Sequence, residues 1–296
     1  MTHQIGNFQG LPTRFLDNGL LRLEVLADAG PRIARLFVFG SPNLLAELPL
    51  DQKLVSQYGD FYFRGGHRLW HSPESIPRTY IPDNAGLTVD ELPDGLRLNG
   101  PTEPGTGITK TIEIHLAEKR ATATVLQTLR NDGLWAVELA PWALTMLRLG
   151  GTAIFPQPVG NADPHGLLNN RILSIWPYTR MNDPRLALRD DFILIRANPS
   201  LPPVKIGYYN PHGWSAYWLD GVLFRKTFDL HPGATYPDNG CNTETYCNHL
   251  FIELESLGPL TQLAPGQSVT LTETWEAFDS LEQDFLPDTI RQQILG

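Results

Sequence analysis

Short runs in which apolar and polar residues alternate recur along the chain. Residues 20–26, 107–118 and 268–278 are clear examples, with Leu, Ile, Val and Thr between charged or polar neighbours. Side chains of a strand point alternately to opposite faces, so this period of two predicts β-strands with one buried face. We predict strands at residues 20–26, 32–40, 86–92, 94–100, 107–118, 120–131, 135–151, 171–178, 191–197, 204–210, 214–220, 221–230, 249–257 and 268–278.

The segments between these runs predict turns and loops. Gly and Pro are frequent, with 26 and 25 residues, and they mark turns such as those at 131–133 and 264–266. We expect residues 42–60 to be irregular with a short helix at 52–58, and residues 155–170 to form an extended surface connection. Only the tail, residues 280–295, has helical periodicity, interrupted at Pro287.

Strands that follow one another without helices between them argue against a βαβ fold and leave a sandwich, a barrel or a propeller. No internal repeat is visible, which argues against a propeller. No linker with a change of composition divides the chain. We therefore predict one all-β domain over residues 1–296, in which two large antiparallel sheets pack face to face, with a short C-terminal helix.

Composition restricts the partners. The 296 residues are 42% hydrophobic and 19% charged, which is typical of a globular protein with a packed core. The net charge of −9 and the lack of a Lys/Arg cluster argue against nucleic acid or an anionic membrane surface as a partner. The sequence shows neither a secretory signal nor an 18-residue apolar segment. We expect a cytoplasmic protein that binds a neutral or polar small molecule, and the pattern leaves the oligomeric state open.

Motifs for common cofactors and metals are missing from the sequence. Cys241 and Cys247 have five residues between them, a spacing that matches neither a zinc nor a redox motif, so we expect free thiols. The chain also has no HExxH, GxSxG or Gly-rich phosphate loop. We therefore expect no metal and no cofactor.

The predicted strand at 249–257 has two acids in an otherwise apolar run. Phe251, Glu253 and Glu255 share one face, and Leu250, Ile252 and Leu254 share the other. In a cleft, repulsion and desolvation would raise the pKa of one acid and leave the other as a base. In solvent, the same alternation describes an ordinary half-buried strand. His249 lies just before the acids on their face, where it is a candidate proton donor or a cap of the strand.

A second candidate is the segment 65–71, Gly-Gly-His-Arg-Leu-Trp-His. Aromatic rings cover the C–H face of a sugar and charged donors bind its hydroxyls, so this mixture is typical of a carbohydrate site. If the segment is a strand, Arg68 and Trp70 point to the same side. The alternative is that Arg68 pairs with an acid such as Glu74 and Trp70 fills the core. His67 and His71 are candidate acids, or simply satisfy local hydrogen bonds.

Other positions are weaker candidates, since buried aromatic residues usually belong to the core. The acids in the loop before residue 249 could bind hydroxyls or serve only a turn. These candidates are Trp142, Trp176, Tyr178, Lys205, Trp214, Asp238 and Glu244.

These motifs resemble the galactose mutarotase-like (aldose 1-epimerase) superfamily, especially a branch with a GGHRLW-type segment. The likeness rests on residues 65–70 and 251–260, a Gly-Pro-Arg-Ile run at 30–33, an Asn-x-Gly turn before a long strand, and Glu-x-Trp at 273–275. It extends over nearly the whole chain. It implies a β-supersandwich with an open, sugar-binding concave face.

The resemblance also implies site residues. In mutarotases a late-strand Glu is the base on the anomeric hydroxyl, and it corresponds here to Glu255, with Glu253 as a neighbour. An upstream Arg that holds the sugar corresponds to Arg68. The family's acid, a His on the central strand, has no counterpart, because Trp142 stands at its place. His67, His71 and His249 are the candidate substitutes.

Three functional hypotheses follow. The first is an aldose 1-epimerase-like, carbohydrate-active isomerase with a Glu base, a relocated His acid, and Arg68 and aromatic residues as sugar contacts. The second is a sugar-binding or sensing protein that kept the cleft and lost the acid. The third is a cleft recruited for lyase, isomerase or cyclase chemistry on a non-sugar substrate, which an aromatic-lined cavity would favour.

Overall fold

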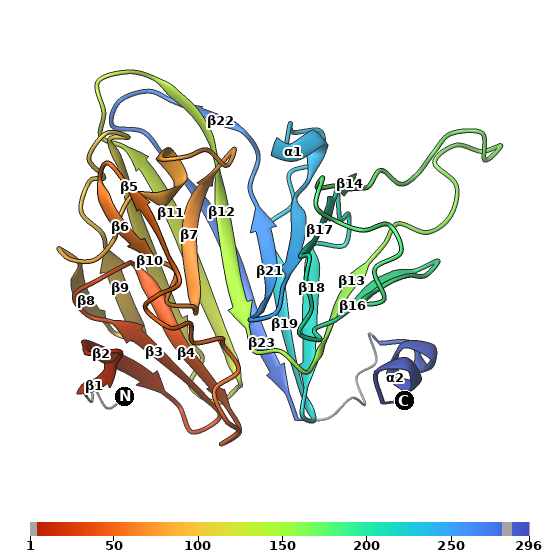
Figure 1. Cartoon of the computed structure of the whole chain (residues 1–296), viewed down its shortest axis with the longest axis horizontal. Helices are drawn as coiled ribbons and strands as arrows, with labels where there is room; N and C mark the ends of the chain where they lie inside the picture. Colours follow the sequence, from red (N-terminus) through yellow and green to blue (C-terminus); the bar gives the residue numbers. More distant parts are fainter. Residues whose placement is uncertain (1–4, 280–285, 296) are drawn as a thin grey trace.

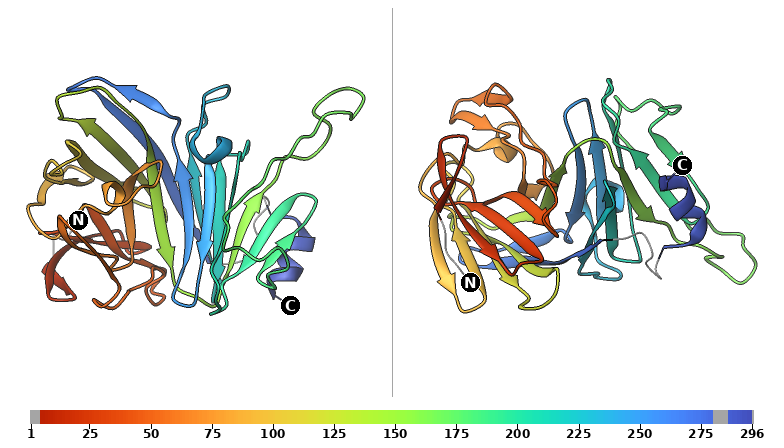
Figure 2. Two further views of the ribbon diagram at one scale, coloured as in Figure 1. Left: turned by 45° about the horizontal axis from the view of Figure 1, so that its top comes forward. Right: turned by 90° about the horizontal axis from the view of Figure 1, so that it is seen from below.

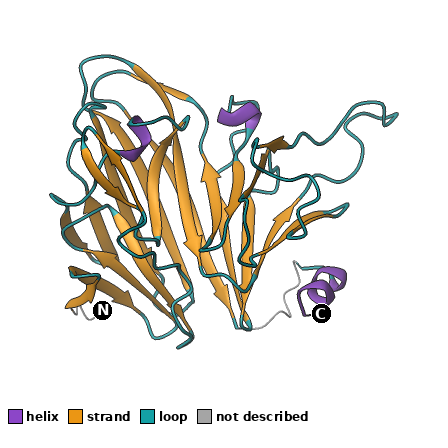
Figure 3. Cartoon of the chain, in the orientation of Figure 1, coloured by secondary structure: helices purple, strands orange, loops and turns teal. Residues whose placement is uncertain are grey.

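The computed structural model describes residues 5–279 and 286–295. Strands make up about half of this part of the chain, and its helical segments are short (Figure 3). Nearly all strands belong to two large sheets in which every pairing is antiparallel. The predicted all-β sandwich is therefore confirmed.

The first sheet has eleven strands (Figure 1). Its order is β1 (Ile5–Phe8), β2 (Leu11–Asp17), β3 (Leu21–Leu26), β4 (Arg32–Val38), β7 (His67–Ser72), β12 (Val137–Leu147), β21 (Ile252–Leu257), β20 (Thr243–Cys247), β17 (Val204–Tyr208) and β14 (Ser174–Ile175). A short strand, β22 (Thr261–Leu263), pairs with the start of β12. The central strands β7, β12 and β21 come from distant parts of the chain and lie side by side.

The second sheet has ten strands. Its order is β15 (Leu186–Leu188), β16 (Phe192–Arg196), β13 (Thr152–Pro156), β18 (Trp214–Leu219), β19 (Val222–Phe228), β23 (Ser268–Phe278), β11 (Thr122–Asn131), β10 (Ile108–Leu116), β9 (Gly95–Asn99) and β8 (Thr88–Leu92). The two further views in Figure 2 show the sheets as separate layers with loops at their ends. A separate hairpin consists of β5 (Lys53–Ser56) and β6 (Gly59–Tyr62).

The main core lies between the two sheets. Strand β10 shows how the sequence produces it: Ile112 and Ile114 are fully buried in the core, whereas Glu113 and His115 on the other face are only half-buried. Trp275 of β23 is fully buried and packs on Phe224 with ring centroids 5.4 Å apart. Burial of these apolar faces is the main stabilising contribution to the sandwich.

A polar cluster also lies between the sheets, which we call the inter-sheet cluster. It comprises His67, Gln127, Thr145, Lys226 and Glu273, all with side chains shielded from solvent. Lys226 Nζ is 2.8 Å from Glu273 Oε1 and donates to Thr145 Oγ1 at 3.0 Å. His67 bonds to Thr145 Oγ1 and to Gln127 Oε1, each at 2.9 Å. These contacts compensate most of the buried polar groups of the cluster, whereas Gln127 Nε2 has no hydrogen-bond partner among the described residues.

Several sequence-based expectations are wrong. Residues 52–58 are not helical but form most of the β5–β6 hairpin, because Lys53 to Ser56 alternate in exposure and Gly59, at φ +111°, allows the turn. The strand expected at 171–178 shrinks to Ser174–Ile175. Strand β20 was missed because its polar residues Thr243 and Glu244 are buried between two partner strands.

The helical segments are the 3-10 turn η1 (Arg78–Tyr80), α1 (Pro237–Gly240) and α2 (Asp288–Leu295). The helix α2 confirms the expected C-terminal helix, but Pro287 directly precedes it and does not interrupt it. The expectation for residues 280–285 lies outside the described residues. In α1, Asp238 and Asn239 both have left-handed backbone conformations, so it is a strained turn.

Candidate functional site

The central strands of the first sheet direct alternate side chains to opposite faces. On β7, Leu69 packs in the main core, whereas Arg68 and Trp70 point to the face away from the second sheet. On β21, Leu254 belongs to the core and Glu253 points to that same outer face. The alternation predicted for both segments is therefore present.

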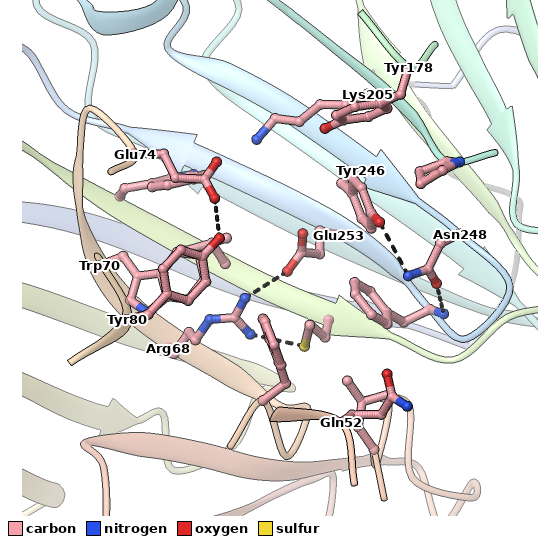
Figure 4. A pocket seen from close by; sticks show the side chains of 17 residues that line it. Gln52, Arg68, Trp70, Glu74, Tyr80, Tyr178, Lys205, Tyr246, Asn248 and Glu253 are labelled. Carbon is pink, nitrogen blue, oxygen red and sulfur yellow. Dashed lines mark hydrogen bonds and ion pairs between the residues drawn. The ribbon is translucent and has the colours of Figure 1, made fainter. Parts of the chain in front are cut away.

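A cavity of about 370 Å³, here called the cleft, lies on this outer face (Figure 4). Its walls come from the central strands and from the loops above them. It is lined by Leu48, Gln52, Phe63, Arg68, Trp70, Glu74, Tyr80, Trp142, Leu144, Met146, Tyr178, Pro203, Lys205, Tyr246, Asn248, Phe251 and Glu253. Aromatic rings and hydrogen-bonding groups alternate around it, as is usual in small-molecule sites.

The glycine pair before β7 fixes the strand that carries Arg68. Gly65 and Gly66 have φ of +90° and +75°, and a Cβ on either would lie within 2.3 Å of a backbone oxygen. The fully buried Arg32 donates to the carbonyl of Gly65 at 2.7 Å and is 3.1 Å from Asp83 Oδ2. The glycines therefore permit a close backbone approach and do not simply add flexibility.

Arg68 and Glu253 form a buried ion pair in the cleft. Arg68 Nη2 donates to Glu253 Oε1 at 3.1 Å, and the guanidinium lies 4.1 Å from the Trp70 ring. Burial raises the pKa of Glu253 to about 8, because desolvation outweighs the attraction of Arg68 and the charge of Glu255 adds to it. At neutral pH the carboxyl of Glu253 can therefore donate a proton, and Arg68 stabilises the anion that results.

Aromatic residues form one wall of the cleft. Trp70 contacts Trp142 and Tyr80 edge to face, with ring centroids 5.4 and 5.0 Å apart. The Tyr80 hydroxyl donates to Glu74 Oε1. Glu74 itself is exposed and lines the cleft, so a carboxylate faces the same space as Glu253 (Figure 4).

Glu255 occupies a different place from Glu253. It is fully buried and does not line the cleft, because Trp142 Nε1 and Lys205 Nζ both donate to its Oε2, at 2.9 and 3.1 Å. Lys205 is also 2.9 Å from Glu244 Oε2. Burial opposes the charge of Lys205, but its attraction to Glu255 and Glu244 raises its pKa well above the ordinary value. Of the two strand acids, Glu253 is the one that reaches the cleft.

None of the three candidate histidines lines the cleft. His67 belongs to the inter-sheet cluster, and desolvation lowers its pKa to about 3. His71 is buried beside Glu103, with Nε2 3.4 Å from Oε2, and lines a separate cavity. His249 is exposed in the turn before β21, which begins only at Ile252, so the strand alternation does not extend to it.

Some of the aromatic candidates line the cleft and others do not. Trp142 and Tyr178 line the cleft, whereas Trp214 of β18 packs on Phe192 in the second sheet. Trp176 lines an adjoining cavity of about 350 Å³. This adjoining cavity is formed by Pro73, Glu74, Ser75, Ile76, Trp142, Trp176, Lys205 and Asp238.

Sequence reasoning did not single out several of the cleft residues. Gln52, Tyr80 and Tyr246 stand in segments that show no chemical motif, and only the fold brings them to the central strands. Asn248 has a visible signal, since an Asn before a strand often holds a turn. Its Oδ1 accepts from the backbone nitrogens of Leu250 and Phe251, at 2.7 and 3.1 Å.

Within the described residues, no three His, Cys, Asp or Glu side chains are arranged to hold a metal ion. None of the helices in this part of the chain is long and apolar enough to cross a membrane.

No family model and no curated protein matches the sequence. Solved structures do match. A galactose mutarotase-like protein from Lactobacillus casei has a TM-score of 0.58 at 12% identity, with 90% of this chain and 100% of that chain covered. A galactose mutarotase related enzyme from Lactobacillus acidophilus has a TM-score of 0.54 at 8% identity, with 93% and 100% covered.

A TPR-domain containing protein from Parabacteroides distasonis has a TM-score of 0.62 at 14% identity. The match covers 94% of this chain and 49% of that protein, so this chain spans about half its length. At such low identity, these likenesses establish the fold and not the chemistry. The chain has the galactose mutarotase-like fold, as its sequence motifs led us to expect.

Proposed function

We propose that the protein is an aldose 1-epimerase-like enzyme that binds a carbohydrate in the cleft and interconverts its anomers. The observation that carries this proposal is the Arg68–Glu253 pair beside the Trp70 and Trp142 rings. Rings of this kind cover the apolar face of a sugar, and charged groups bind its hydroxyls. The mutarotase-like fold of the chain supports the same substrate class.

In the proposed mechanism two carboxyl groups share the proton transfers. Glu74, as a carboxylate, takes the proton of the anomeric hydroxyl while the bond between C1 and the ring oxygen breaks. Glu253, as an acid, gives its proton to the ring oxygen, and Arg68 stabilises the carboxylate that forms. Rotation about C1–C2 and the reverse transfers close the ring as the other anomer and restore both groups.

The electrostatics of the cleft support this assignment of roles. Two carboxyls with different environments are the usual source of an acid–base pair. Glu253 has a raised pKa, and the nearby charge of Glu74 contributes to it. Glu74 is exposed and accepts a hydrogen bond from Tyr80. The mechanism needs no imidazole, in keeping with the absence of the three candidate histidines from the cleft lining.

Exchange spectroscopy by NMR on a panel of aldoses tests this proposal. Wild type should accelerate α/β exchange of at least one aldose, and Glu253→Gln should lower the catalysed rate by about 10²–10⁴-fold, the usual contribution of a general acid. Glu255→Gln is the matched variant, because Glu255 does not line the cleft, and its catalysed exchange rate should fall less than that of Glu253→Gln. Exchange at the background rate with every aldose would rule out the enzyme.

A second candidate is a sugar-binding protein without turnover. The observation that favours it is the position of Glu255, which Trp142 and Lys205 hold away from the cleft. Calorimetry distinguishes the two candidates, because this one requires saturable binding of a sugar whose anomers wild type does not interconvert.

A further inference from the structure

The adjoining cavity lies next to the cleft. The two cavities share Glu74, Trp142 and Lys205 as lining residues, and they are called here the two compartments of the site. Their volumes are about 370 and 350 Å³. A ligand confined to the first compartment would leave the second one empty.

Each compartment is lined by two tryptophan side chains. In the cleft these are Trp70 and Trp142, beside other aromatic residues, and in the adjoining cavity they are Trp142 and Trp176. Lys205 Nζ lies 4.7 Å from the ring centroids of both Trp142 and Trp176, so one cation contacts both indoles. Repeated aromatic faces along a groove suit a chain of sugar rings better than one ring.

The charges of the two compartments indicate an uncharged ligand. In the part of the chain that the structure describes, two cations line them: Arg68 donates to the carboxyl of Glu253, and Lys205 pairs with Glu244 and Glu255. The carboxylates of Glu74 and Asp238 also line the adjoining cavity. A phosphate or carboxylate on the second sugar would therefore meet these carboxylates, and the cation that lines the adjoining cavity, Lys205, already has two carboxyl partners.

Building on the proposed function, we infer that the ligand is an uncharged oligosaccharide of at least two units. One sugar occupies the cleft, and the next occupies the adjoining cavity beside Trp142 and Trp176. Trp176 is then a specificity-determining residue, because it contacts only the second sugar.

Calorimetric titration tests this inference with glucose, galactose and mannose, and with maltose, cellobiose, lactose and mannobiose. At least one disaccharide should bind about tenfold more tightly than its monosaccharide, as one added aromatic contact would provide. Trp176→Ala should bring this affinity ratio close to one, and Trp176→Phe should retain most of it. Glucose 6-phosphate and glucuronate should bind no more tightly than glucose.

Trp135→Ala is the matched control, because Trp135 is 80% exposed and lines neither compartment. It should leave the affinity ratio unchanged. If monosaccharides bind and no disaccharide binds more tightly, the second compartment is not a sugar subsite. The proposed function would still stand. An unchanged ratio in Trp176→Ala, or tighter binding of the anionic sugars, would also overturn the inference. If no saccharide binds wild type, both the inference and the proposed function fail.

Discussion

The inter-sheet cluster and the cleft are two charged regions that share strands β7 and β12, one on each face of the first sheet. His67 and Arg68 are consecutive residues of β7, yet His67 joins the cluster and Arg68 reaches the cleft. Thr145 and Met146 of β12 divide in the same way. One strand therefore supplies side chains to a buried polar network on one face and to a ligand-accessible cleft on the other.

The two regions differ in how far neighbouring charges offset the burial of their carboxyl groups. Glu273 in the cluster accepts from Trp275 Nε1 at 2.9 Å and faces Lys226. Burial opposes its ionisation, but Lys226 and His67 outweigh burial and hold its pKa below the ordinary value. Glu253 is also buried, but there burial dominates and raises its pKa to about 8. A buried carboxyl thus serves structure or proton transfer according to how completely its neighbours compensate its charge.

The largest expected effect is on stability, and it comes from the cluster. Lys226→Met leaves Glu273 as an uncompensated buried charge, which should lower the free energy of unfolding by about 3–5 kcal/mol. Urea unfolding measures this loss. The double variant Lys226→Met/Glu273→Leu is the control, because removal of both charges should restore much of the stability. A single variant as stable as wild type would show that the pair is not structural.

A second effect, gradual and spread over several pH units, is the pH dependence that Glu253 contributes. Its pKa is raised on folding, so between about pH 4.5 and 8 the folded state holds a proton that the unfolded state releases. This group should therefore reduce stability as pH rises, by about 1.4 kcal/mol per pH unit within that window. Glu273, with a lowered pKa, should act in the opposite sense and reduce stability only as pH falls below about 4.5.

Urea unfolding of wild type and Glu253→Gln at several pH values between 5 and 8 isolates this contribution. The stability difference between the two proteins should change steadily with pH in the predicted direction. A difference that stays constant across the window would mean that Glu253 is already ionised throughout it.

The smallest effect is expected for Arg68→Met, because the Arg68–Glu253 pair borders the cleft and water can reach it. Its stability loss should be smaller than that of Lys226→Met. Sugar affinity should fall by about 10- to 100-fold, the loss of a hydrogen bond to a charged group. Calorimetry on the best-bound saccharide measures the affinity, and full affinity in this variant would remove Arg68 from the site.

The sequence predicts the faces of the strands well, because alternation decides them locally. It separated Arg68 and Trp70 from Leu69, and Glu253 from Leu254, as the structure does. It did not predict β20, since Glu244 is polar yet buried beside Lys205, a contact that only the assembled sheet provides.

The sequence also does not reveal which residues the assembled sheet brings into the site. Alternation places Glu253 and Glu255 on one face, but it does not show that Trp142 and Lys205 cover Glu255. Glu74 and Tyr80 belong to the connection after β7, where no pattern marks their position. Which acid reaches the cleft is therefore a property of cross-strand packing and loop placement, and not of residue spacing.

The most direct test of the central claim is the titration of the buried carboxyl groups by carbon-13 NMR, with Glu253→Gln and Glu273→Gln to assign the resonances. We predict that the Glu253 carboxyl titrates near pH 8 and that the midpoint shifts when a saccharide binds, whereas the Glu273 carboxyl stays ionised down to pH values below 4.5. A Glu253 titration midpoint below pH 5 that does not change when the saccharide binds would contradict the account.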